Sequence, residues 1–110
     1  MAVNPFKNEV EAKLADKTIK LRATFQAIAE IEDAFDLPLF KIVMEKLNNA
    51  DMRVNQIVDV YEIGSRAAEA PVSREELQEL IAEAGTVEAI GNLVPFLTNA
   101  FAGGKPTKKK

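Results

Sequence analysis

Residues 9–35, EVEAKLADKTIKLRATFQAIAEIEDAF, change their apolar rhythm near Phe25. Before Phe25, apolar and polar residues alternate, which is the two-residue period of a half-buried strand. From Phe25 onward, the apolar residues fall three and four positions apart, which is the period of an amphipathic helix. The stretch therefore predicts a small β-hairpin that leads directly into a helix.

The turn of this hairpin is predicted within ADKT, residues 15–18, because Asp16 can hydrogen-bond its own backbone. Taking Asp16 and Lys17 as the two loop residues fixes the register. Glu11 then lies opposite Arg22 as an opposite-charge pair on the solvent face. A hairpin by itself is marginally stable in water, so its apolar face is expected to pack on helices.

Caps and prolines divide the rest of the chain into about five short helices. The residues expected to begin them are Thr24, Pro38, Asp51, Ser73 and Thr86. The apolar face of the second helix is assigned to Leu39, Phe40, Val43, Met44 and Leu47. The last helix is expected to follow Gly85 and run to Phe101, with a kink at Pro95 because proline removes a backbone hydrogen bond.

These elements predict an α+β fold that is mostly α, with an N-terminal β-hairpin packed on about five short helices. One domain is expected over residues 9–102, with the hairpin at residues 9–23 and the helices at residues 24–102. Residues 1–8 are predicted to be a flexible lead-in. Residues 103–110 are predicted to be a disordered basic tail.

The residue types present argue against an enzyme. The 110 residues include no histidine and no cysteine, so the commonest general base, the commonest metal ligand and any thiolate ligand are missing. Glu30 and Asp33 are neighbours on a predicted helix, but they lie on its polar face, where nothing would separate their pKa values. There is no glycine-rich phosphate loop. We therefore expect no catalytic residue, metal or cofactor.

The charge of the chain is divided between an acidic body and a basic end. Four lysines lie in the last six residues; without them, 10 basic residues face 17 acidic ones, a difference of −7. An acidic body repels nucleic acid. No apolar stretch approaches the roughly 20 residues that span a membrane, and MAVNPFKNEV lacks a signal-peptide core. A cytoplasmic protein that binds neither nucleic acid nor membrane is expected.

Binding to another protein is the remaining class of function. Three apolar residues lie away from the apolar stripe of their own helix when about 100° is counted per residue: Ile42, Ile63 and Phe96. Each alone is explained equally well by a core that wraps around the helix, or by chance. The three together predict a contact surface for another chain. The GSRAA segment at residues 64–68 would allow close helix packing, either with a partner or inside the fold.

Residues 10–47, VEAKLADKTIKLRATFQAIAEIEDAFDLPLFKIVMEKL, resemble a family of small proteins from the tail gene clusters of gene transfer agents and related prophages. The family pattern is a strand end followed by a helix with two glutamates. The residues that fit it are Leu21, Ala27, Ile28, Ala29, Glu30, Ile31 and Glu32. The resemblance extends over about residues 8–102 and consists of patterned apolar positions rather than a catalytic signature.

This resemblance implies a non-enzymatic phage or gene-transfer-agent tail assembly protein. Members look like chaperones that cover the tape measure protein during tail morphogenesis, although the family has also carried a tail tube label. The implied partners are the tape measure protein, tail tube subunits or both, and a homo-oligomer stays open. Two alternatives also stay open: a structural minor tail or tail tube component, and a small acidic regulator or inhibitor.

Overall fold

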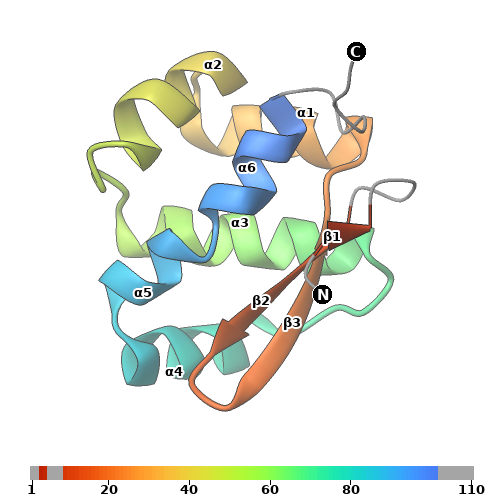
Figure 1. Cartoon of the computed structure of the whole chain (residues 1–110), viewed down its shortest axis with the longest axis vertical. Helices are drawn as coiled ribbons and strands as arrows, with labels where there is room; N and C mark the ends of the chain where they lie inside the picture. The colour runs from red at the N-terminus through yellow and green to blue at the C-terminus, as the bar shows by residue number, and fades with distance from the viewer. Residues whose placement is uncertain (1–2, 5–8, 102–110) are drawn as a thin grey trace.

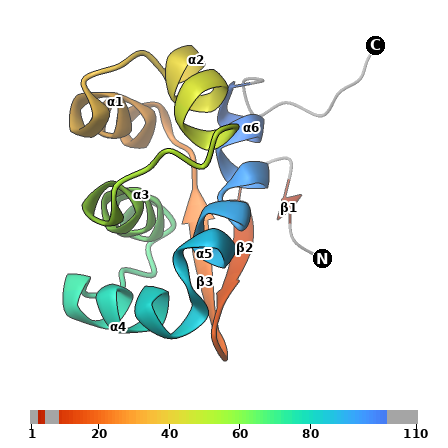
Figure 2. The same ribbon diagram turned by 90° about the vertical axis from the view of Figure 1, so that its left-hand side faces the viewer.

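The computed structural model describes the backbone of residues 3–4 and 9–101 and the side chains of residues 9–100. The basic tail predicted for residues 103–110 lies outside this part of the chain. Figures 1 and 2 show a small antiparallel sheet at one side of a set of short helices. The fold is α+β and mostly α, with an N-terminal hairpin, as the sequence predicts.

The sheet has one more strand than predicted. Its order is β1-β2-β3, and its strands are β1 (Val3–Asn4), β2 (Glu9–Leu14) and β3 (Lys17–Arg22). β1 lies within the predicted lead-in and pairs antiparallel with β2 through Val3 opposite Val10. On β2 and β3 the apolar residues are buried and most polar ones exposed, because successive side chains of a strand point to opposite faces.

The predicted register of the hairpin is wrong by two residues. The loop is formed by Ala15 and Asp16, so Leu14 lies opposite Lys17 and Ala12 opposite Ile19. Ala15 takes a positive φ of 55°, which lets a two-residue loop close the hairpin one residue earlier than expected. Because the shift is an even number, every side chain keeps its predicted face.

The ion pair across the hairpin moves with the register. Arg22 lies opposite Glu9, not opposite Glu11, and its guanidinium nitrogen is 2.6 Å from a Glu9 carboxylate oxygen. Lys17 at the turn pairs with Glu76, which joins the hairpin to a helix far along the chain. The Glu9–Arg22 pair lies on the solvent face of the sheet. Lys17 lies on the helix-facing side with Ile19 and Leu21, which fill the core, but it stands at the turn and is exposed.

The first two helices begin where the sequence predicts. Helix α1 spans Phe25–Phe35, and its N-cap Thr24 accepts a hydrogen bond from the backbone N–H of Ala27 at 3.0 Å. Asp36 ends α1 in the left-handed conformation. After Pro38, a short α2 (Leu39–Lys41) continues into a π-helix, η1 (Ile42–Leu47).

Helix α3, Val54–Ala67, is the central helix of the molecule. It packs against β3, α1 and α4 (Figures 1 and 2), so it is buried on several sides. Its N-cap is Arg53, not Asp51; the backbone N–H of Arg53 donates to the side chain of Gln56 at 2.9 Å. Val54, the first residue of α3, is half exposed.

The last part of the chain forms three helices instead of two. Helix α4 (Arg74–Ala84) begins after Ser73, whose hydroxyl accepts from the N–H of Glu76. Gly85, at a φ of 96°, then leads into α5 (Thr86–Gly91). The predicted continuous final helix is wrong: the chain breaks after Gly91, and α6 (Val94–Phe101) is a separate helix with Pro95 in its first turn.

Within the described residues, no single helix is long and apolar enough to cross a membrane. The segments Arg74–Ala84 and Thr86–Ala100 together have the length and composition of a membrane span, but they meet at a bend of 110°.

Candidate protein-contact surface

The structure buries all three residues predicted to contact a partner. Ile42 and Phe96 are completely buried, and Ile63 is 9% exposed. Their predicted exposure is therefore wrong, and in this fold they belong to the hydrophobic core. Each error has its own local cause.

Ile42 is buried because its helix does not have the α-helical period. Within η1 the backbone N–H of Asn48 donates to the carbonyl of Val43, five residues earlier, at 3.1 Å. A turn of π-helix holds more residues than a turn of α-helix, so angles counted at 100° per residue fail here. Ile42 and Leu47, five apart, both reach the core, whereas Phe40 and Met44 of the predicted apolar face are 54% and 46% exposed.

Ile63 is buried because α3 has more than one apolar side. The apolar stripe expected for this helix includes Tyr61 and Gly64, which contact α5, β3 and α6, whereas Ile63 lies toward α1. An amphipathic pattern with a single stripe describes a surface helix. A central helix instead buries residues around most of its circumference, and α3 does so at Ile57, Val58, Val60, Tyr61, Ile63, Gly64 and Ser65.

Phe96 is buried because α5 and α6 do not share an axis. Because the helix breaks after Gly91, the angle between Ile90 and Phe96 cannot be counted along one continuous helix. A Cβ placed on Gly64 would lie 3.1 Å from the Phe96 ring and 2.9 Å from Leu21. The small residue at position 64 therefore allows close packing inside the fold. This was one of the two explanations that the sequence left open for the GSRAA segment.

Other large apolar side chains are exposed instead. Those more than about two-fifths exposed among the described side chains are Phe25, Phe40, Met44, Val54, Val87 and Val94. Phe25 is the most open, at 89% exposed. It occupies the first position of α1, directly after the cap, so no earlier turn of the helix lies beneath its side chain. In the sequence, Phe25 lies at the edge of the apolar stripe of Ile28, Ile31 and Phe35, which was the signal for this exposure.

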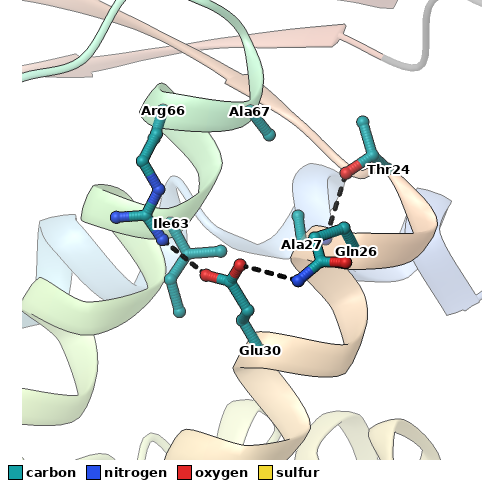
Figure 3. Close-up of a pocket in the computed structure, with 7 residues that line it drawn as sticks. All are labelled: Thr24, Gln26, Ala27, Glu30, Ile63, Arg66 and Ala67. Atoms are coloured by element: carbon teal, nitrogen blue, oxygen red, sulfur yellow. Dashed lines mark hydrogen bonds and ion pairs between the residues drawn. The ribbon is translucent and has the colours of Figure 1, made fainter.

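A surface groove lies between α1 and α3 (Figure 3). Its volume is about 190 Å³, and its lining is formed by Thr24, Gln26, Ala27, Glu30, Ile63, Arg66 and Ala67. Ile63 therefore contributes to a groove wall, although little of its surface is exposed. Apolar atoms of Ala27 and Ala67 lie near one ion pair, Glu30 with Arg66. Such a lining can accept an apolar side chain that carries a polar end.

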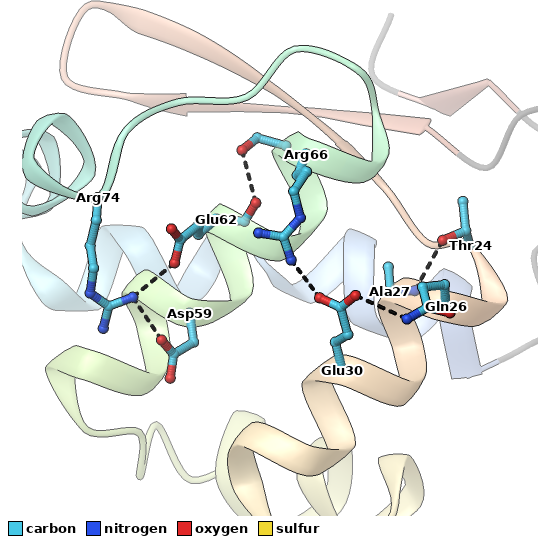
Figure 4. Close-up of polar contacts among 9 residues, drawn as sticks. Thr24, Gln26, Ala27, Glu30, Asp59, Glu62, Arg66 and Arg74 are labelled. Carbon is cyan, nitrogen blue, oxygen red and sulfur yellow. Dashed lines mark hydrogen bonds and ion pairs between the residues drawn. The ribbon is translucent and has the colours of Figure 1, made fainter.

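Most charged groups of this face hold helices together (Figure 4). Glu30 of α1 pairs with Arg66 of α3 and accepts a hydrogen bond from Gln26 at 3.1 Å. Arg74 at the start of α4 donates to Asp59 at 2.8 Å and to Glu62 at 2.9 Å, both on α3. The hydrogen bond to Asp59 is the main cause of a raised Arg74 pKa. These carboxylates are engaged in ion pairs that fix helix positions.

Tyr61 is a fully buried side chain whose pKa is raised well above its ordinary value. Its hydroxyl donates to the backbone carbonyl of Ala89 at 2.7 Å, which ties α3 to α5. Burial raises the pKa of Tyr61, and the charge of Glu88 raises it further. A buried, neutral tyrosine whose hydroxyl is hydrogen-bonded in this way helps to hold two helices together.

The described residues offer no group of three or more His, Cys, Asp or Glu side chains placed to hold a metal ion. Glu30, one of the two neighbouring carboxylates that the sequence places on this helix, is paired with Arg66.

Comparison with known protein families gives a match over most of the chain. A family model described as phage tail tube protein, GTA-gp10, matches residues 7–103. No curated protein matches the chain. No solved structure matches it either. The match covers nearly the whole chain and the same region in which the sequence resembles gene-transfer-agent tail proteins. The chain belongs to the GTA-gp10 family of phage tail tube proteins.

Proposed function

We propose that this protein acts in tail assembly by binding other tail proteins, without catalysis, and that it is a chaperone of the tape measure protein. The family places the chain among tail proteins of phages and gene transfer agents. A chaperone for a long helical protein needs exposed apolar contacts on an acidic body. Both features are present here.

The size of the sheet is the observation that favours a chaperone over a tail tube subunit. A tail tube subunit usually needs a sizeable β-sheet to form the wall of the tube. Here the two longer strands have six residues each and the third has two. Most of the described chain is helix instead. Such a small sheet favours a protein that attaches to tail components over one that builds the wall.

The surface beside the start of α1 is the contact we assign to the partner. Phe25, at the start of α1, is exposed to solvent, and its chain neighbours Thr24 and Gln26 line the groove between α1 and α3. An amphipathic helix docks by laying its apolar residues into such a groove. The Glu30–Arg66 pair at the groove can then meet the polar edge of that helix.

A permanent tail tube component is the second candidate, and the description of the family favours it. Quantitative mass spectrometry of purified particles separates the two. We expect a chaperone to be present in the producing cell and absent from finished particles, with the capsid protein as internal standard. Recovery in a fixed ratio that follows the symmetry of the tail would overturn the chaperone proposal and establish the tube role.

Co-purification with fragments of the tape measure protein tests the contact surface. Phe25→Ser should weaken co-purification without lowering the melting temperature, because an 89% exposed side chain contributes little to folding. Val87→Ser is the matched control, since Val87 is 80% exposed on α5. Equal weakening by both substitutions would indicate unspecific apolar binding and would contradict the assigned surface.

A further inference from the structure

Strand β3 is an edge of the sheet. The strand order β1-β2-β3 gives β3 a partner on one side only, within residues 3–4 and 9–101. Its side chains Ile19 and Leu21 are buried against the helices, so the strand is held in place by the core. A rigid, unpaired edge is a template for another extended chain.

The hairpin register shows which backbone groups face outward. A two-residue loop is closed by a hydrogen-bonded pair, here Leu14 and Lys17, and such pairs alternate with non-hydrogen-bonded ones. The outward N–H and C=O groups of β3 are therefore those of Thr18, Lys20 and Arg22. The same alternation directs Lys13 of β2 outward, where its carbonyl accepts a hydrogen bond from Asn92.

The charges of β3 select an acidic partner. Lys17 and Arg22 are paired with Glu76 and Glu9, whereas Lys20 has no carboxylate within 4 Å among the described residues. β2 shows the pattern that fits such a strand, because Glu11 lies opposite Lys20 on the solvent face. A second β3 would instead bring a second set of three cations to the same edge.

We propose that the outer edge of β3 binds an extended acidic segment of another protein by β-strand addition. Backbone hydrogen bonds to Thr18, Lys20 and Arg22 supply the binding. Glutamates at alternate positions of the added strand lie on the solvent face, the face of Lys20 and Arg22, and one of them meets the ammonium group of Lys20. This site is separate from the groove between α1 and α3. It does not depend on whether the protein leaves the finished particle.

The probe is a blocked seven-residue peptide, TEVEVET, compared with a matched peptide in which lysine replaces each glutamate. Backbone amide NMR of the whole protein measures binding up to millimolar peptide. The acidic peptide should slow amide exchange at Thr18, Lys20 and Arg22. The amides of Ile19 and Leu21, which already face β2, should be unaffected. The lysine peptide should bind more weakly.

Two variants separate strand addition from unspecific charge attraction. Thr18→Pro removes an outward N–H but no hydrogen bond of the β2–β3 ladder, and proline is tolerated on an edge strand. It should abolish binding, whereas Thr18→Val should retain it. Lys20→Glu should weaken binding of the acidic peptide by roughly threefold to tenfold, since exposed charge pairs are weak. Thermal melts confirm that each variant is folded.

Three results would overturn the proposal. The first is no change at the three amides at millimolar acidic peptide. The second is unchanged binding by folded Thr18→Pro. The third is a concentration-dependent dimer in sedimentation experiments that Thr18→Pro disrupts, because that result assigns the edge to a second copy of this chain.

Discussion

At the scale of single residues, Phe96 shows how a local break in a helix changes which side chain enters the core. Its ring is completely buried near Gly64 and Leu21, although a continuous helix would turn it outward. Phe25, at the edge of the apolar stripe of its helix, is 89% exposed instead. The two phenylalanines therefore make a matched pair for experiment.

Phe96→Ala should destabilise the protein by about 3–5 kcal/mol, because it removes a fully buried aromatic side chain and leaves a cavity. Phe25→Ala should change the free energy of unfolding by no more than about 0.5 kcal/mol. Urea unfolding followed by circular dichroism measures both. A stable Phe96→Ala protein would show that α6 is rotated from its described orientation.

Tyr61 predicts how stability changes at alkaline pH. Burial raises its pKa in the folded protein above the ordinary value of 10.0. Below pH 10 the hydroxyl is protonated in both states, so its contribution is fully present. As the pH rises above 10, the unfolded state loses the proton first and the contribution of Tyr61 is progressively lost, at up to about 1.4 kcal/mol per pH unit.

Tyr61→Phe isolates this effect. At pH 7 it should cost about 0.5–1.5 kcal/mol, because the hydrogen bond to the carbonyl of Ala89 is lost. Between pH 10 and pH 11.5 its stability should fall less steeply than that of the wild type. Tyr61 is the only tyrosine in the chain, so absorbance at about 295 nm follows its ionisation directly. An ordinary titration midpoint in the folded protein would contradict the described burial.

At the scale of elements, the hairpin is a part of the core rather than an attachment. Leu21→Ala should destabilise the protein by about 2–5 kcal/mol, since Leu21 is fully buried against α3. Lys20→Ala, on the opposite face of β3, should stay within about 0.5 kcal/mol. Denaturant unfolding compares them, and equal losses would mean that the faces of the strand are exchanged.

At the scale of the whole molecule, the protein is expected to gain no stability from common ligands. It lacks histidine, cysteine and a phosphate-binding loop. Zn²⁺, Mg²⁺ and ATP should therefore leave the melting temperature unchanged in thermal scans. A ligand that binds the native state at 100 times its Kd would add about 2.7 kcal/mol. A reproducible rise of several degrees with any of the three would reveal a site that the residue types do not indicate.

The sequence by itself determined the elements whose signals are local. The alternation of residues 9–14 specified a strand with one buried face, and Thr24 and Ser73 specified helix starts through their own hydroxyl groups. The absence of histidine and cysteine excluded any site that needs an imidazole or a thiolate, since no tertiary arrangement can supply a missing side chain. The family followed from the same patterned positions.

Only the tertiary structure decided which apolar residues face solvent, and with them the candidate site. Ile42 depends on a π-helix, Ile63 on the many neighbours of α3, and Phe96 on the break before α6. Each of these is settled by how elements pack together, whereas an angular count assumes one straight α-helix with one buried side. The groove between α1 and α3 and the outer edge of β3 likewise exist only once α1, α3 and the sheet are assembled. A contact surface is a property of that assembly, because it is formed by residues far apart in the chain.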